Sequence, residues 1–176
     1  MSDHPRLQAV SKSRWTPLAA LLLVGLLVGA WLADDYGMSW DEERNYTVGF
    51  DALQSYVSPE RYQDYLSHGE PLSHHGPSYF MLFALIAQGA TALNPAWHIA
   101  DGRHLANYLS FLLGLAGFYA LALRLVARRY AWMATALLAT QPLLFGHAFI
   151  NQKDTPFMAF FLVSVAVGLE AADRVS

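Results

Sequence analysis

The chain has 176 residues, of which 55% are hydrophobic and only 14% are charged. A soluble domain carries about 25% charged residues, so the composition indicates a membrane protein. The net charge of -3 is accompanied by no basic stripe, which argues against a nucleic-acid partner, and the absence of cysteine excludes disulfides, thiolate metal sites and a cysteine nucleophile.

Five apolar runs follow one another along the chain. They are Pro17–Ala33, Ser78–Leu93, Leu105–Ala127, Ala131–Phe149 and Pro156–Ala172. A membrane-spanning helix needs roughly 20 apolar residues, with a range of about 17–25. The third and fourth runs meet this length, the first and fifth are at its short end, and the second is doubtful. Pro142 lies inside the fourth run and predicts a kink there.

The first apolar run has two readings, because the basic residues Arg6, Lys12 and Arg14 precede it. A cleaved signal peptide would end in small residues with an A-x-A-like pattern. Trp31 stands where one of those small residues should be, two positions before Ala33. We therefore expect an uncleaved anchor.

Basic residues also predict which side of the membrane each segment faces, because cytoplasmic loops carry the excess of Lys and Arg. The basic start of the chain predicts a cytoplasmic N-terminus over residues 1–16 and an outer loop over residues 34–77. That loop holds nine of the fourteen acidic residues of the chain, namely Asp34, Asp35, Asp41, Glu42, Glu43, Asp51, Glu60, Asp64 and Glu70.

The second apolar run, Ser78–Leu93, decides the number of spans. If it crosses the membrane, Arg128 and Arg129 fall outside, against the charge rule. If it lies in the outer interface or re-enters it, both arginines fall at the cytoplasmic face. We therefore predict an all-α membrane protein with four transmembrane helices, an interfacial helix over residues 78–93 and an extracytoplasmic first loop, with five spans as the alternative.

A first polar cluster lies in the predicted outer loop, around Asp41 and Glu42. Ser39 followed three residues later by Glu42 fits a capping box, so the cluster reads most simply as a helix start. Carboxylates held at a helix start are also well placed to act as a general base or as a cation ligand. Both readings stay open from these residues alone.

A second cluster, over residues 68–77, contains Glu70 and three histidines. His74 and His75 are adjacent and would point apart on any regular element, whereas zinc motifs favour spacings such as i, i+4. A phosphate-facing role for His74 or His75 therefore fits better than a structural zinc site. Arg103, which precedes the third run, either binds a ligand or extends from the helix end to the membrane surface.

A third cluster lies between the fourth and fifth runs, in a predicted second outer loop over residues 150–155. Pro156 in a first helical turn, with Asp154 or Thr155 as the cap, is an ordinary helix start. That reading does not account for Lys153 and His147, which gather beside the acid. Only the four-span scheme places this loop on the same side of the membrane as the first one.

Six short motifs follow one another along these clusters. They are Trp40-Asp41-Glu42-x-x-x-Tyr46, His75-Gly76-Pro77-Ser78-Tyr79-Phe80, Arg103-His104-Leu105, Arg128-Arg129, Gln141-Pro142 and Asn151-Gln152-Lys153-Asp154-Thr155-Pro156-Phe157. In this order the chain resembles the N-terminal half of the multi-spanning GT-C glycosyltransferases, above all the protein O-mannosyltransferase and aminoarabinose transferase branch (glycosyltransferase family 39). The resemblance covers about residues 15–172.

The resemblance implies a reaction. An acceptor hydroxyl attacks the anomeric carbon of a sugar held on a polyprenyl phosphate, with inversion, on the extracytoplasmic side. The catalytic Asp-Glu pair of the family falls on Asp41 and Glu42, with Asp41 as the expected general base. The Asp of its second outer loop falls on Asp154. A divalent cation held by Asp41 and Asp154 is possible within the resemblance, since only some members of the superfamily use one.

The resemblance also implies groups that bind the lipid phosphate. The Arg at the start of the family's next helix falls on Arg103, which would stabilise the departing phosphate together with His75 or Lys153. The cationic segment before it falls on residues 74–77. Here the chain departs from the family, with Gly76 in place of the first proline and histidines where Lys often occurs, so phosphate binding at His74 and His75 would depend on pH.

The implied partners are the lipid bilayer and a polyprenyl-phosphate sugar donor, in the inner (plasma) membrane of a bacterium, with the acceptor undefined. Family members are much longer, so we expect residues 17–176 to be the N-terminal part of such a module, which would leave this chain inactive on its own. The alternative is a non-enzymatic membrane protein, either a transporter fragment or an assembly subunit. Transporters place functional charges near the bilayer midplane, where the predicted spans have almost none.

Overall fold

The computed structural model describes residues 15–58, 60, 63 and 77–175, and every regular element within them is an α-helix. The helices are α2 (Thr16–Leu32), α3 (Glu42–Ser55), α5 (Ser78–Leu93), α6 (Ile99–Leu125), α7 (Arg128–Ala139), α8 (Pro142–Ile150) and α9 (Asp154–Val175). The predicted all-α class is therefore correct for the part of the chain that the structure describes.

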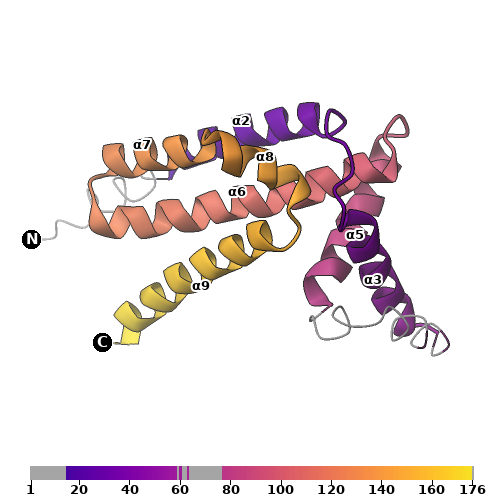
Figure 1. Cartoon of the computed structure of the whole chain (residues 1–176). Helices are drawn as coiled ribbons and strands as arrows, with labels where there is room; N and C mark the ends of the chain where they lie inside the picture. The colour runs from indigo at the N-terminus through magenta and orange to yellow at the C-terminus, as the bar shows by residue number, and fades with distance from the viewer. Residues whose placement is uncertain (1–14, 59, 61–62, 64–76, 176) are drawn as a thin grey trace, which may run out of the picture.

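The described helices run along a bundle in alternating directions (Figure 1). Helix α2 runs one way, α6 returns, α7 and α8 run out again, and α9 returns. Packing agrees with the picture, because Leu18 at the start of α2 lies in one cluster with Tyr119 and Ala131, while Leu32 at its end packs on the cluster that contains Phe149. Helices α3 and α5 lie together at one end of the bundle (Figure 1).

The two ends of the bundle differ in charge. One end, which we call the arginine end, carries Arg124, Arg128, Arg129 and Arg174 at helix termini. The other, which we call the site end, carries α3, α5 and the loops before α3 and α9 (Figure 1). The residues of both polar loops that were singled out in the sequence and that the structure describes therefore lie at the same end.

Two described helices, α6 and α9, are long and apolar enough to cross a membrane, and α7 with α8 makes a third candidate if the pair counts as one bent span. At 1.5 Å per residue, the 22 residues of α9 extend about 33 Å, close to the hydrocarbon thickness of about 30 Å. Helices α2 and α5 are shorter and apolar. These features are consistent with a membrane protein.

The fourth apolar run, Ala131–Phe149, is not a single helix. It is divided between α7 and α8, which meet at an angle of 62°. The kink predicted at Pro142 is thus confirmed, because Pro142 has no N–H to donate and begins a new helix. Side chains satisfy the backbone around the break, since Gln141 Oε1 accepts from the Leu144 N–H and Thr140 Oγ1 donates to the Ala136 carbonyl.

Small residues let the long helices approach closely, as is typical of membrane bundles. A Cβ at Gly29 of α2 would lie 2.3 Å from the ring of Tyr108 on α6. On another face of α6, a Cβ at Gly114 would lie 3.3 Å from the Cα of Ala159, and one at Gly117 would lie 2.9 Å from the backbone of α9. Helix α6 is therefore the centre of the bundle, against which α2 and α9 pack.

Helix α5 lies against the site end of α6. Near its start, the Tyr79 hydroxyl donates to Asn107 Oδ1 at 3.0 Å, and further along α5 the Ala87 carbonyl oxygen lies 2.4 Å from where a Cβ on Gly102 would be. Its bounds coincide with the predicted run Ser78–Leu93. Residues 79–87 of α5 thus lie beside residues 102–107 of α6, and the two helices run in opposite directions. Helix α5 therefore covers the site end of α6 and does not extend to the arginine end.

The backbones of α3 and α5 touch at Gly49. A Cβ at this position would lie 2.1 Å from the carbonyl oxygen of Phe80 and 2.4 Å from its carbonyl carbon. Neither atom can rotate away, since both belong to the α5 backbone. The crossing therefore depends on glycine, and it fixes α3, whose first residue follows Asp41.

We expect Gly49→Ala to lower the free energy of unfolding by about 1–3 kcal/mol, because the helices must separate to admit the methyl group. Gly89→Ala is the matched control, since Gly89 is also helical and a Cβ there meets nothing within 4 Å. That control should be neutral or stabilise by up to about 1 kcal/mol through helix propensity. Denaturant unfolding followed by circular dichroism in detergent micelles measures both, and equal stabilities would contradict the crossing.

Candidate active site

The loop before α3 and the loop between α8 and α9 are joined by polar contacts at the site end. Lys153 Nζ lies 2.7 Å from Asp41 Oδ2. Asn45 Nδ2 donates to Gln152 Oε1 at 2.9 Å inside the protein. Each contact bridges more than 100 residues of sequence. The two polar clusters predicted to act together are therefore adjacent.

A pocket of about 360 Å³ opens between these loops. It is lined by Ser39, Trp40, Asp41, Asn45, His147, Ile150, Asn151, Gln152, Lys153 and Asp154. A single pocket is thus lined by four of the residues that were singled out in the sequence, namely Asp41, His147, Lys153 and Asp154. The lining also includes Asn45 and Gln152, whose role was not predicted.

The loop between α8 and α9 is shaped by Asn151. Its Oδ1 accepts from the backbone N–H groups of Lys153 and Asp154, at 3.2 and 2.9 Å, and its Nδ2 donates to Asp154 Oδ2 at 2.9 Å. Asn151 is therefore the residue that caps α9, and the prediction of Asp154 or Thr155 as the cap is wrong. Thr155 Oγ1 instead donates to the His147 carbonyl. This turn directs Lys153 toward Asp41.

Glu42 lies beneath the pocket and does not line it. The side chain is fully buried, and its Oε2 accepts from the Ser39 N–H at 3.1 Å and lies 3.4 Å from His104 Nε2. His104 Nδ1 donates to the Ala33 carbonyl at 2.8 Å. Glu42 therefore holds the first loop against α6, and the catalytic part predicted for it stays a prediction.

The capping box predicted for the start of α3 is only half formed. Glu42 accepts from the Ser39 N–H, as expected, but Ser39 Oγ donates to the Ile150 carbonyl at 3.1 Å and not to the helix. Asp41, the residue before α3, makes no side-chain cap either. The Ser39 hydroxyl joins the two loops, and the Asp41 carboxylate is directed to Lys153.

Arg103 is separate from the pocket lining. Its Nη1 lies 2.6 Å from Glu43 Oε2, and its guanidinium lies over the ring of Tyr46 at 4.0 Å from the centroid. The residue is only 2% exposed, so it does not extend to the surface as a snorkelling side chain would. Its Nε has no hydrogen-bond partner among the described residues. Arg103 thus anchors the first turns of α3 through Glu43 and Tyr46.

Asn107 connects α5 with the end of α8, a role that was not predicted. Its Nδ2 donates to the carbonyls of Ala148 and Asn151, each at 3.0 Å, and its Oδ1 accepts from Tyr79. Carbonyls at the end of a helix lack partners within it, so this amide satisfies them inside the protein. The signal in the sequence was a single Asn near the start of an apolar run.

Tyr36 covers the inner side of the first loop. Its ring stacks on Phe149 of α8, with ring centroids 4.2 Å apart. Burial, and to a smaller extent the nearby Asp35 carboxylate, raises the pKa of the Tyr36 phenol above its usual value. The ring therefore stays neutral and serves to pack the loop on α8.

The remaining predictions concern a metal ion at Asp41 and Asp154 and phosphate binding by His74 and His75. Within the described residues no three His, Cys, Asp or Glu side chains are grouped to hold a metal ion. Asp41 and Asp154 both line the pocket, but Asp41 pairs with Lys153 and Asp154 accepts from Asn151. Two carboxylates engaged in this way are a poor fit to a metal site. His74 and His75 fall outside the described residues.

The pocket thus combines carboxylates, an ammonium group and an imidazole at one end of an apolar bundle. Such a group of side chains can take a proton from a hydroxyl and stabilise an anion that leaves. No protein-family model, curated protein or solved structure matches this chain.

Proposed function

We propose that this protein takes part in transferring a sugar from a polyprenyl-phosphate donor to an acceptor hydroxyl, with inversion at the anomeric carbon. The observation that carries the proposal is the pairing of Asp41 with Lys153 across a pocket at one end of the bundle. A base and a cation side by side suit a reaction in which a proton is removed and a phosphate is released. The order of the sequence motifs supports the same chemistry.

In the proposed reaction the acceptor hydroxyl oxygen forms a bond to the anomeric carbon, and the bond from that carbon to the phosphate oxygen breaks. Asp41 takes the hydroxyl proton as general base. The phosphate leaves with the bonding electron pair, so no further reactant is needed. Asp41 is accessible for this role, because its side chain is 53% exposed at the pocket.

Lys153 is proposed to stabilise the departing phosphate. The Lys153 side chain is 42% exposed and its ammonium group is bound to Asp41, so an incoming phosphate can replace the carboxylate as its partner. The exchange would also release Asp41 to accept the proton. His147 lines the same pocket and is proposed as a second phosphate-facing group, in place of Arg103, which the Glu43 carboxylate and Tyr46 ring enclose.

We further propose that the bundle crosses a bacterial inner membrane four times, through α2, through α6, through α7 with α8, and through α9. Helix α5 would lie in the membrane interface, and the site end would face the extracytoplasmic side. The arginine end carries Arg124, Arg128, Arg129 and Arg174, as the charge rule requires of a cytoplasmic face. Arg103 and Arg124 are 21 positions apart on α6, about 32 Å at 1.5 Å per residue. That is one hydrocarbon thickness.

The proposal is tested with membranes that contain the protein expressed from its complete reading frame. They are supplied either with a radiolabelled polyprenyl-phosphate sugar or with the same sugar on a soluble nucleotide. We expect labelled product from the lipid-linked donor only, with the configuration at the anomeric carbon inverted. Membranes lacking the protein are the control. Product from the nucleotide sugar alone, or none from any polyprenyl-phosphate sugar, would disprove the proposal.

A further inference from the structure

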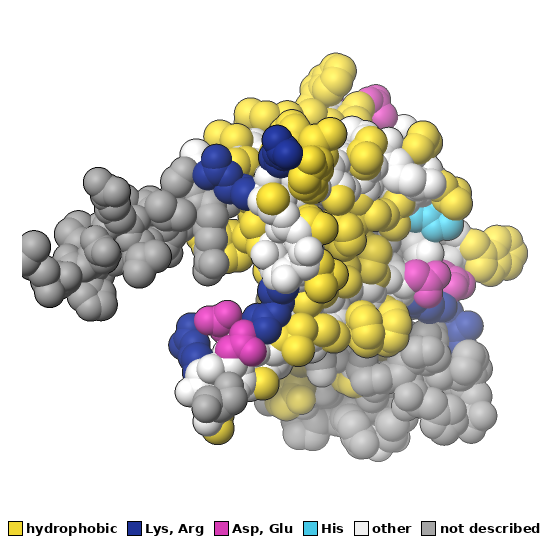
Figure 2. All heavy atoms as spheres, turned by 90° about the vertical axis from the view of Figure 1, so that its left-hand side faces the viewer, with side chains coloured by type: hydrophobic (Ala, Val, Ile, Leu, Met, Phe, Trp, Pro, Cys, Tyr) yellow, Lys and Arg dark blue, Asp and Glu magenta, His cyan; other side chains and the backbone are white. Residues whose placement is uncertain are grey.

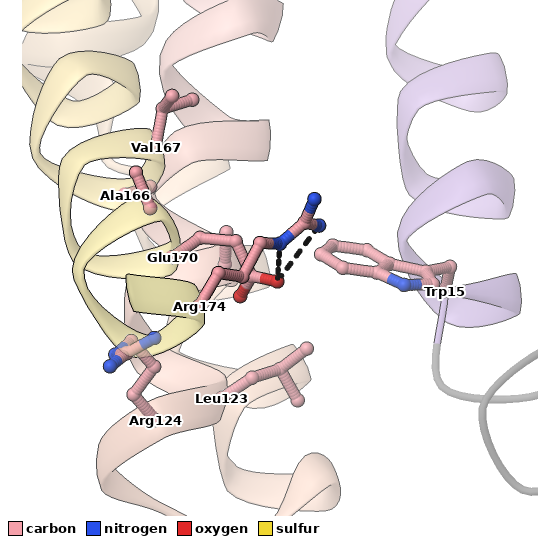
Figure 3. A pocket seen from close by; sticks show the side chains of 9 residues that line it. Trp15, Leu123, Arg124, Ala166, Val167, Glu170 and Arg174 are labelled. Carbon is pink, nitrogen blue, oxygen red and sulfur yellow. Dashed lines mark hydrogen bonds and ion pairs between the residues drawn. The ribbon is translucent and has the colours of Figure 1, made fainter. Parts of the chain in front are cut away.

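A second pocket, of about 600 Å³, lies at the arginine end, at the opposite end of the bundle from Asp41. Its walls come from α6, from α9 and from Trp15, the residue before α2 (Figure 3). Nothing in the proposed glycosyl transfer uses it. Its shape and composition nevertheless point to a particular ligand.

One wall of the pocket is apolar. Small and aliphatic side chains make this wall, with Ala120 and Leu123 from α6 and Ala166, Val167 and Ala171 from α9. Alanines at three of these positions leave a groove between two helices that otherwise pack closely through glycines. A groove of this kind, parallel to membrane-crossing helices, fits a hydrocarbon chain.

The rim of the pocket is charged. Figure 3 shows the Arg174 side chain extending between Glu170 and the ring of Trp15. Arg174 Nη2 lies 3.1 Å from Glu170 Oε1, and Arg174 is 76% exposed. Exposed pairs of this kind contribute only about 0–1 kcal/mol. A phosphate, which an arginine binds through two parallel hydrogen bonds, can therefore replace the carboxylate.

The surroundings of the pocket favour an anion. In the described part of this end there are four arginines but only two acids, Glu170 and Asp173. Figure 2, which looks onto this end, shows basic side chains on both sides of a hollow. Asp173 is already engaged by Arg124, at 2.6 Å. The end therefore carries an excess of two positive charges.

The rim also lies at the correct height for a lipid headgroup. Residues 105–123 of α6 and 157–169 of α9 contain no charged side chain, whereas Arg124 and Glu170 follow directly. The change from apolar to charged residues on both helices marks the boundary of the hydrocarbon layer. Trp15 at the same level is typical of the aromatic belt found there.

We propose that this pocket binds an anionic phospholipid, with its phosphate on Arg174 and one acyl chain along the apolar wall of α6 and α9. Basic pockets between membrane helices are suited to such headgroups. The site is distinct from the Asp41 pocket and does not depend on the activity proposed there. Glu170 competes with the phosphate for Arg174, which gives the proposal two variants with opposite expected effects.

Native mass spectrometry of the full chain, purified from mixed micelles with equal phosphatidylglycerol and phosphatidylcholine, tests the proposal. Wild type should retain phosphatidylglycerol preferentially. Arg174→Gln should lower that retention about tenfold, as expected when a charge-assisted hydrogen bond to the phosphate is lost, and Glu170→Gln should raise it. Arg129→Gln is the matched control, because it removes one charge at the same end outside the pocket lining.

Ala166→Phe adds a ring to the apolar wall and should lower the retention of both lipids. Equal retention of the two lipids by wild type would overturn the proposal. So would equal losses in Arg174→Gln and Arg129→Gln, which would mean general attraction to the surface. A second copy of the chain found in place of bound lipid would assign the groove to self-association instead. Circular dichroism checks that each variant is folded.

Discussion

Replacing Asp41 by Asn is expected to lower sugar transfer by about 100-fold to 10,000-fold, the usual contribution of a general base. The amide has nearly the shape of the carboxylate but cannot take the proton of the acceptor hydroxyl. Because Asp41 is exposed and makes no helix cap, the change should leave the fold intact. Transfer from a radiolabelled polyprenyl-phosphate sugar in membranes measures the effect.

Asp34→Asn is the matched control for that variant. Asp34 is an exposed acid of the same loop and does not line the pocket, so its variant should transfer sugar at the wild-type rate. An Asp41→Asn protein that is as active as wild type would remove Asp41 from the mechanism. An equal loss in both variants would show that the charge of the loop, and not the position of one carboxylate, is what matters.

Replacing Lys153 by Met is expected to lower transfer by about 100-fold to 1,000-fold, as when one charge-stabilising donor is lost from an active site. Methionine keeps nearly the length of the apolar stem of lysine and lacks the ammonium group. Lys153→Arg should retain most activity, since it keeps both the charge and the donors. The loss should appear in kcat more than in KM, because the phosphate charge develops as the bond breaks.

The pairing of Lys153 with Asp41 also predicts how the two substitutions combine in a double variant. Since the two side chains are 2.7 Å apart, Asp41→Asn combined with Lys153→Met should cost less than the product of the single losses. Arg129→Met, at the arginine end, is the charge-matched control and should be fully active. If the two single losses simply multiply, the salt bridge has no part in the reaction.

Apolar patterning predicts much of this fold. The bounds of α5 coincide with the predicted run Ser78–Leu93, and α2 begins and ends one residue before the predicted anchor. Both runs are continuous and end at polar or turn-forming residues, so their limits are visible in the sequence. The kink at Pro142 follows from proline chemistry alone.

The beginning of α6 was not predicted, because the apolar run starts at Leu105 while the helix starts at Ile99. The turns before Leu105 carry Arg103 and His104, whose polar side chains exclude them from a run chosen by hydropathy. Their side chains are nevertheless buried, and a box between His98 and Asp101 caps the helix. That box was a readable signal, since the two residues are three positions apart.

The candidate site was predicted only in part. Asp41, Lys153 and Asp154 could be named because charged residues are rare here and stand beside apolar runs. The burial of Glu42 and its contact with His104 could not be foreseen, since they require α6 to pack beneath the first loop. The same holds for Asn45 and Gln152, whose hydrogen bond depends on how the two loops meet.

The bend between α7 and α8 sets the position of Lys153. Helix α8 has nine residues, so it acts as a lever about 14 Å long, with Pro142 at the pivot and the Lys153 loop at the tip. A rotation of about 10° at the pivot would move the tip by about 2 Å, by the rise of 1.5 Å per residue. That displacement is enough to separate the ammonium group from Asp41, so the contact between Lys153 and Asp41 depends on the angle at which α8 leaves α7.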